Sequence, residues 1–169
     1  MMETADLILD KACIEDWKDM YENVWSREES SRYMFWKVTT SKEDGKARME
    51  RTIEFQKSHD TYLVYEKNSH KAIGFAGLQK VKEGVCEETG ICLGPDYVSR
   101  GYGKQILKAL IDRAKQVYHA NYFYYCCRKE NLASINLALS CGFILKETYE
   151  RYDERDDTSY TMLRYRKQI

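Results

Sequence analysis

The stretch "DYVSRGYGKQIL", residues 96–107, places two glycines and two cationic side chains where an amphipathic helix begins. Neither glycine favours a helix, because glycine loses the most conformational freedom when its backbone is fixed. A helix start carries N–H groups without intrahelical acceptors and a partial positive charge, so it favours a bound anion. Glycines let an anion approach the backbone closely, and Arg100 and Lys104 add positive charge. The stretch is therefore typical of a phosphate or pyrophosphate site.

The residue spacing of this stretch does not match either of two common nucleotide-binding motifs. A Rossmann fingerprint, G-x-G-x-x-G, requires glycine where Ile106 stands, and it follows a strand in a βαβ unit. A Walker A loop requires glycine at Val98 and serine or threonine where Gln105 stands. On this stretch alone, a glycine-containing turn before an ordinary helix stays open as the alternative.

The helix after the glycines is the clearest in the chain, because apolar residues recur every three or four positions from Ile106 to Tyr118. Elsewhere, apolar periodicity and turn residues predict the other elements. In chain order we expect a strand over 5–12, helices over 14–25 and 41–57, strands over 60–67, 70–82 and 84–94, a helix over 103–118, a strand over 122–128, a helix over 131–143, and strands over 144–152 and 159–166. This order predicts an α/β protein built around one mixed sheet.

Length and composition narrow the classes of protein further. A chain of 169 residues has the length of one domain. Twenty-seven basic side chains balance twenty-seven acidic ones, so the overall charge predicts neither nucleic acid nor an anionic membrane as a partner. No apolar run approaches the roughly 20 residues of a membrane helix. The N-terminal stretch "MMETADLILD" lacks the features of a secretory signal.

The six cysteines show no C-x-x-C spacing, and the three histidines stand far from any pair of them. This pattern argues against a zinc site, so we expect no metal. It favours free, buried thiols in a reducing cytoplasm over a disulfide framework. The sequence therefore predicts a cytoplasmic protein.

Three segments together resemble the GNAT superfamily of N-acetyltransferases. "VSRGYG" resembles its Q/R-x-x-G-x-G/A signature, except that Val98 replaces the first residue. "EETGICLGP" is similar to the E-I-G-Y-x-L-x-P strand of the branch that acetylates N-termini of ribosomal proteins, and "NLASINLALSCGF" is similar to its second motif. Two motifs in the right order are far more specific than one, which makes the plain glycine turn the weaker interpretation.

The resemblance implies a single GNAT domain over 1–169, with a mixed, mostly antiparallel sheet of about seven strands and helices on both faces. It implies that acetyl-CoA lies in a V-shaped opening between the strands at 86–94 and 122–127. The residues implied in cofactor binding are Ile91, Cys92 and Leu93 through their backbone, Ser99, Arg100, Gly101, Tyr102, Gly103 and Lys104 around the pyrophosphate, and Asn131. Asn131 also fits a helix cap, and both roles stay open.

Acetylating an amine requires loss of a proton from an ammonium of pKa about 10, stabilisation of an oxyanion, and a proton for the leaving thiolate. Glu88 stands at the glutamate of the family strand and is the candidate base, directly or through water. A solvent-facing strand carboxylate is the alternative, since Glu87 points the opposite way. The backbone N–H of Cys92 or Leu93 would meet the oxyanion.

The proton donor departs from the common family pattern. Many GNAT enzymes use a tyrosine at the position that Ala138 occupies here. The N-terminal acetyltransferase branch implies Ser134 instead. The alternative is that Ser134 is an ordinary residue of the first helical turn.

The acceptor site is expected near the aromatic segment at 25–36. Trp25, Tyr33, Phe35 and Trp36 are the candidate substrate-binding residues, although each also fits ordinary core packing. The acidic turn at 153–157 could attract a cationic amine, with solvated surface charge as the alternative.

These observations predict an enzyme that moves an acetyl group from acetyl-CoA to a primary amine by direct attack on the thioester. The acceptor is a peptide N-terminus or a small-molecule amine, and the protein is expected to be a monomer or a homodimer. The alternative function is a non-catalytic GNAT-fold module that binds acyl-CoA as a sensor.

Overall fold

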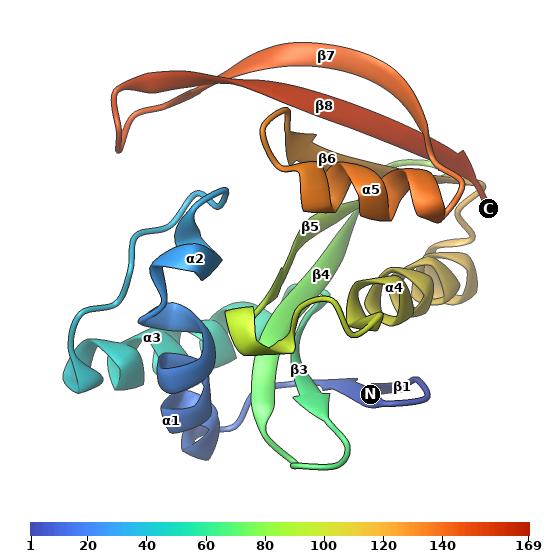
Figure 1. Cartoon of the computed structure of the whole chain (residues 1–169). Helices are drawn as coiled ribbons and strands as arrows, with labels where there is room; N and C mark the ends of the chain where they lie inside the picture. Colours follow the sequence, from blue (N-terminus) through green and yellow to red (C-terminus); the bar gives the residue numbers. More distant parts are fainter. The chain divides into compact units, whose positions relative to one another are not determined.

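The computed structural model describes residues 1–169, and its eight strands form one sheet in the order β1-β2-β3-β4-β5-β6-β8-β7 (Figure 1). The strands are β1 Met2–Glu3, β2 Leu7–Asp10, β3 Thr61–Glu66, β4 Ala72–Lys82, β5 Val85–Leu93, β6 Tyr122–Arg128, β7 Ile144–Asp153 and β8 Thr158–Gln168. The pair β5 and β6 is parallel, whereas β6 pairs antiparallel with β8 and β8 antiparallel with β7. The predicted mixed, mostly antiparallel sheet is confirmed. The additional strand, β1, has two residues, which is too short for any periodic signal.

The helices are α1 Trp17–Met20, α2 Glu28–Ser31, α3 Lys42–Gln56, α4 Tyr102–Tyr118 and α5 Leu132–Ser140. The helix predicted over 14–25 is divided into a 3₁₀ turn, α1 and a π-helical turn over Tyr21–Trp25. The Ser26 N–H donates to the Tyr21 carbonyl at 3.0 Å, and the Ser26 hydroxyl donates to the same oxygen at 2.7 Å. Apolar spacing over five residues does not separate a π turn from an α turn, so the sequence predicted one continuous helix.

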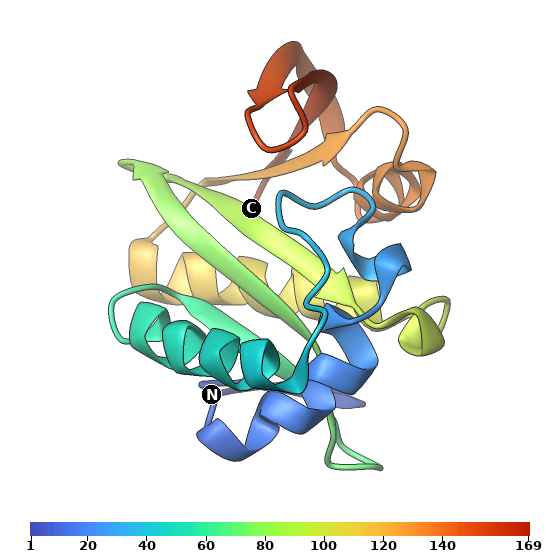
Figure 2. The ribbon, with the colours of Figure 1, turned by 90° about the vertical axis from the view of Figure 1, so that its left-hand side faces the viewer.

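The chain forms two compact units. The N-terminal unit comprises 1–79 and 89–110, and the C-terminal unit comprises 80–88 and 111–169. In the N-terminal unit, α3 lies over one face of β3 and β4 and the start of α4 lies behind the other (Figure 2). Its core is a cluster of buried side chains, namely Met20, Val24, Trp25, Met49, Leu63, Ala72 and Cys92.

Capping residues set the ends of the helices as the sequence predicts. The Ser41 hydroxyl accepts a hydrogen bond from the Asp44 N–H at 3.1 Å and begins α3. In the C-terminal unit, Asn131 caps α5, and Gly142 follows its end with φ +79°. The chain then enters β7 through Phe143, which is buried against Phe123 and Tyr125 of β6.

The acidic turn between β7 and β8 contains one buried carboxylate. Asp153 is buried, and its carboxylate accepts hydrogen bonds from Arg155 at 2.8 and 2.6 Å. Arg128 lies 3.9 Å from the same carboxylate. The remaining residues, 154–157, are exposed, as solvated surface charge would be, while Asp156 and Asp157 accept hydrogen bonds from the Tyr160 and Tyr152 hydroxyls.

Replacing Asp153 with asparagine is expected to lower the free energy of unfolding at neutral pH. The hydrogen bonds from Arg155 lower the pKa of Asp153 from 3.8 to about 2. The stabilisation is therefore complete above the unfolded-state pKa and is lost as the pH falls through the folded-state pKa. Urea unfolding should give a constant difference from wild type above about pH 5 and a shrinking one below about pH 4. A difference independent of pH would contradict this assignment.

Candidate active site

The glycine loop before α4 has the backbone geometry of an anion site. Ser99 and Gly101 both adopt the left-handed conformation, with φ of 62° and 78°. The N–H groups of Lys104 and Gln105 donate to the Gly101 carbonyl at 3.2 and 3.4 Å, which starts the helix. The amides before Lys104 are first-turn groups, which have no intrahelical acceptor. A methyl group added at Gly101 would meet no protein atom within 4 Å, so the space beside this residue is open.

Glu66, at the end of β3, anchors this loop, and sequence analysis missed it. Its carboxylate accepts hydrogen bonds from the Tyr102 hydroxyl at 2.8 Å and from the Arg100 guanidinium at 3.2 Å. The Ser69 hydroxyl donates to its second oxygen at 2.7 Å. These bonds, led by those from Ser69 and Tyr102, lower the pKa of Glu66, so it is a buried carboxylate anion. Local sequence carries no signal for a contact over 36 residues.

The two cationic side chains of the loop, Arg100 and Lys104, differ in how firmly they are held. Arg100 is held by Glu66 and also donates to the Asp96 carbonyl at 2.9 Å, while half of its side chain stays exposed. Lys104 is exposed on the first turn of α4. The loop thus combines one fixed and one exposed positive charge.

The segment Ile91–Leu93 of β5 belongs to the N-terminal unit. The side chain of its central residue, Cys92, packs in the core of that unit. Cys92 is buried, and its thiol lies 3.6 Å from the Ser30 carbonyl, to which it donates. Burial raises the pKa of Cys92 to about 12, so this group stays a thiol. The Cys92 side chain is therefore part of the core, and a role of its backbone toward a ligand stays a prediction. β5 ends before Pro95, which opens a short 3₁₀ turn.

Glu88 lies in the C-terminal unit and is buried, which excludes the solvent-facing alternative. Its Oε1 accepts a hydrogen bond from the Cys126 N–H of β6 at 3.1 Å. Glu87, the preceding residue, forms an ion pair with Arg164 at 3.5 Å. The parallel pairing of Glu87 with Tyr124 places these two carboxylates at the same level of β6.

Glu88 and Ser134 both influence the pKa of the Tyr125 phenol, a relation that the sequence did not reveal. Burial raises the pKa of the Tyr125 phenol above its ordinary range, the charge of Glu88 adds to the shift, and a hydrogen bond with Ser134 opposes it. The phenol is therefore neutral at physiological pH and can act as a hydrogen-bond donor. In the sequence, Tyr125 is one of three tyrosines in a buried strand, which is a packing pattern.

The first turn of α5 holds two predicted site residues. The Ser134 N–H donates to Asn131 Oδ1 at 3.1 Å, so Asn131 is the helix cap. Ala138, one turn after Ser134, is completely buried and offers no polar group. The proton donor common in the resembled family is thus absent at this position.

The four predicted aromatic acceptor residues separate into two pairs. Trp25 is 2% exposed and packs in the core, yet it also lines a cavity of about 590 Å³. Trp36 lines the same cavity. Tyr33 and Phe35 are half-buried and do not belong to its lining. The structure therefore brings together Trp25 and Trp36 but not the other two.

The sequence was compared with models of protein families. The model of the acetyltransferase (GNAT) domain matches residues 6–144. The chain therefore belongs to the GNAT acetyltransferase family. It is an enzyme that uses acetyl-CoA as the acetyl donor. Sequence comparison with curated proteins gives no significant match.

Solved structures of other GNAT proteins share the fold of this enzyme. The microcin C7 self-immunity acetyltransferase MccE, solved with acetyl-CoA and AMP, is 17% identical with a TM-score of 0.83, over 98% of this chain and 94% of that one. A Salmonella typhimurium acetyltransferase that modifies the N-terminal serine of ribosomal protein L7/L12 is 18% identical with a TM-score of 0.79, over 98% and 96%. Spermidine N-acetyltransferase from Vibrio cholerae, solved with CoA and spermine, is 14% identical with a TM-score of 0.76, over 98% and 96%. These likenesses confirm the GNAT fold.

Two further features bear on the classes of ligand. None of the helices of this GNAT acetyltransferase combines the length and the apolar character needed to span a membrane. No group of three or more His, Cys, Asp or Glu side chains is arranged to hold a metal ion.

Replacing Gly101 with alanine is expected to weaken acetyl-CoA binding at least tenfold. The methyl group would occupy the open side of the loop, and φ +78° is strained by about 1–2 kcal/mol for a residue with a Cβ. Gly84, in the turn before β5, has φ +69° and provides the matched control. Isothermal titration should give weaker binding for G101A and unchanged binding for G84A, with similar losses of thermal stability. Equal affinities in both variants would contradict the loop as the phosphate site.

Proposed function

We propose that this GNAT acetyltransferase acetylates a primary amine, on a peptide N-terminus or a small molecule, by direct attack of the amine on the thioester. The observation that carries the proposal is the buried Glu88 carboxylate, which the Cys126 N–H of β6 holds at 3.1 Å within the unit that also contains Ser134. Together the Glu88 and Ser134 side chains offer a proton acceptor and a proton donor, both of which amine acetylation requires.

The donor site is proposed to include the glycine loop and the segment Ile91–Leu93. Acetyl-CoA supplies the acetyl group as an activated thioester. The backbone amides from Arg100 to Lys104 are the proposed donors to a pyrophosphate, and the charges of Arg100 and Lys104 favour it. The N–H of Cys92 or Leu93 is the proposed donor to the negative charge that develops on the carbonyl oxygen. Open space at Gly101 supports the fit of a phosphate group.

Glu88 is the proposed base, acting directly or through water. Its carboxylate accepts a hydrogen bond from the Cys126 N–H, which orients the group. Ser134 is the proposed hydrogen-bond donor to the departing sulfur. Tyr125, whose phenol stays protonated because it is buried, is a proposed positioning residue.

Further parts of the proposal concern the protein as a whole. We propose that residues 1–169 form a single GNAT domain, which the family match over 6–144 supports. A cytoplasmic location is supported by six cysteines that form no disulfide. A monomer or a homodimer is proposed for its state in solution.

The function is tested with acetyl-CoA and a panel of peptide and small-molecule amines, read by release of free CoA thiol. Glu88→Gln should lower kcat by about two orders of magnitude while acetyl-CoA affinity is retained, because glutamine still accepts from Cys126 but does not take a proton. Glu87→Gln is the matched control, since this carboxylate pairs with Arg164, and it should act like wild type. If the protein binds acetyl-CoA but releases no CoA thiol with any amine of the panel, the proposed transferase is overturned and the acyl-CoA sensor is favoured.

Ser134→Ala should lower kcat about tenfold to a hundredfold, because the departing sulfur loses its donor. Ser140→Ala, at the other end of α5, removes a hydroxyl that only donates to the Leu137 carbonyl, and it should leave kcat unchanged. Stopped-flow measurement of single turnovers separates the chemical step from product release. If S134A turns over at the wild-type rate, Ser134 is an ordinary residue of the first turn of α5 and not the donor to the departing sulfur.

A further inference from the structure

A cavity of about 590 Å³ lies within the N-terminal unit, between α3 and strands β3 and β4. Its aromatic walls include Trp25, Trp36 and Phe75. Three of its lining side chains, Lys37, Arg48 and Arg51, are cationic, and none is a carboxylate. A positive cavity with aromatic walls has the chemistry of a site for an anionic ligand.

Arg48 is the central cation of this cavity. Its guanidinium lies 4.8 Å from the ring centroid of Trp25 and 4.4 Å from that of Trp36, so it contacts both indole rings. One nitrogen donates to the Thr39 hydroxyl at 3.0 Å. Thr39 itself is fixed by its N–H bond to the Trp25 carbonyl at 2.8 Å. A guanidinium has five N–H donors, and no carboxylate pairs with this one.

The electrostatics around Arg48 are unfavourable without a bound anion. Burial lowers the pKa of Arg48 to about 10, and the charge of Arg51 acts in the same direction. Arg48 is still a cation at neutral pH, and it is partly desolvated beside a second cation. Arg51 and Lys37 are exposed and form no ion pair. An anion in the cavity would offset the desolvation of Arg48, because opposite charges attract most strongly where water is excluded.

A second polar group in the cavity wall also has no partner. The indole Nε1 of Trp36 is buried and makes no hydrogen bond. A buried donor without an acceptor costs roughly 1–3 kcal/mol. Indole nitrogens and guanidinium groups are both donors, so the cavity offers donors where an acceptor such as a carboxylate would satisfy them.

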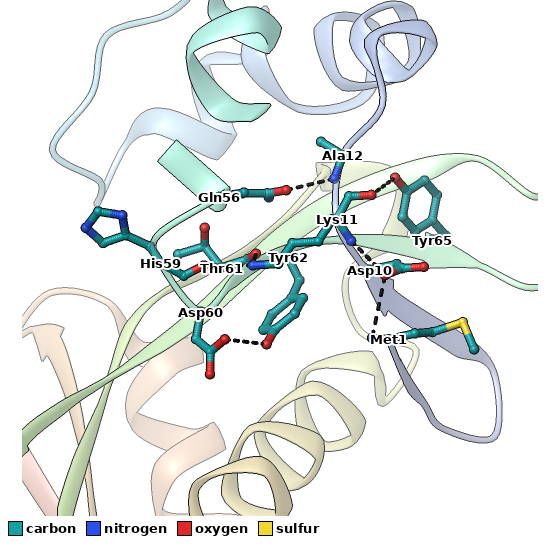
Figure 3. A network of polar contacts seen from close by, with 10 residues as sticks. All are labelled: Met1, Asp10, Lys11, Ala12, Gln56, His59, Asp60, Thr61, Tyr62 and Tyr65. Carbon is teal, nitrogen blue, oxygen red and sulfur yellow. Dashed lines mark hydrogen bonds and ion pairs between the residues drawn. The ribbon is translucent and has the colours of Figure 1, made fainter. Parts of the chain in front are cut away.

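The floor of the cavity is rigid. Gln56 at the end of α3 accepts a hydrogen bond from the Ala12 N–H at 2.7 Å, and Lys11 donates to the carbonyls of His59 at 2.7 Å and Thr61 at 3.1 Å (Figure 3). Gln56, Thr61 and Tyr62 all line the cavity. A rigid floor reduces the ordering cost of binding a small ligand.

The cavity also adjoins the proposed donor segment of β5. Trp25, which lines the cavity, belongs to the same core cluster as Cys92, whose backbone N–H is a proposed oxyanion donor. A ligand bound at Arg48 would therefore lie near the strand where we propose that the acetyl group is held.

From this geometry we infer that the cavity binds the carboxylate of the acetyl acceptor, and that the acceptor is a carboxylate-bearing amine such as an amino acid or a short acidic peptide. The inference rests on the proposed function and gives it a substrate class. It predicts discrimination against polyamines, because a cavity with three cations and no carboxylate repels them.

Binding is tested with two compounds that need no turnover. N-acetyl-L-phenylalanine carries a carboxylate, whereas N-acetylphenethylamine is the matched compound without it. Quenching of the fluorescence of Trp25 and Trp36 should show at least tenfold tighter binding of the carboxylate compound. Arg48→Met should remove this preference, Arg48→Lys should retain part of it, and Arg32→Met, on the exposed segment after α2, should leave it unchanged. Equal binding of both compounds, or a preference that persists in R48M, would overturn the inference.

Kinetics distinguish failure of this inference from failure of the proposed function. L-phenylalanine should have a lower KM than phenethylamine, and R48M should raise the KM for L-phenylalanine while kcat changes little. Turnover of both amines with equal KM in wild type and R48M would overturn the anion site and leave the transferase intact. Arg48-dependent binding of N-acetyl-L-phenylalanine without turnover of any amine would support the anion site and overturn the transferase.

Discussion

The buried carboxylate of Glu66 is the interaction on which the glycine loop before α4 depends. A buried carboxylate without donors is costly, so its three donors are held in defined positions. Two of them, Tyr102 and Arg100, belong to the glycine loop, and they fix the entry to α4 from both sides of Gly101. The left-handed residues Ser99 and Gly101 then turn the backbone so that the first-turn amides stay available to a phosphate.

A similar constraint shapes the C-terminal unit. Glu88 is buried, and the backbone N–H of Cys126 satisfies one of its oxygens. Tyr125, the neighbour of Cys126, stays protonated because burial raises its pKa. Strand β6 thus holds the proposed base through a backbone amide.

Local patterns in the sequence predicted the elements and the loop but not the contacts that hold them. The helix expected over 103–118 is α4, and the cap at Asn131 is present, because both follow from periodicity and spacing within a few residues. Glu66 and Tyr125 were missed, since one acts across 36 residues and the other resembles a packing residue. The burial of Asp153 was missed for the same reason, because Arg128, which lies beside its carboxylate, is distant in sequence. The cavity at Arg48 likewise combines residues from several elements, which only the folded chain brings together.

The central claim, that the loop anchored by Glu66 holds acetyl-CoA, is tested most directly by calorimetric titration of acetyl-CoA into wild type and Glu66→Gln. Glutamine still accepts a hydrogen bond from Tyr102 but carries no charge to hold Arg100, so the account predicts clear binding by wild type and about tenfold weaker binding by the variant. Thermal unfolding of both proteins would verify that the variant is folded. Absence of acetyl-CoA binding to wild type, or equal affinity in E66Q, would contradict the account.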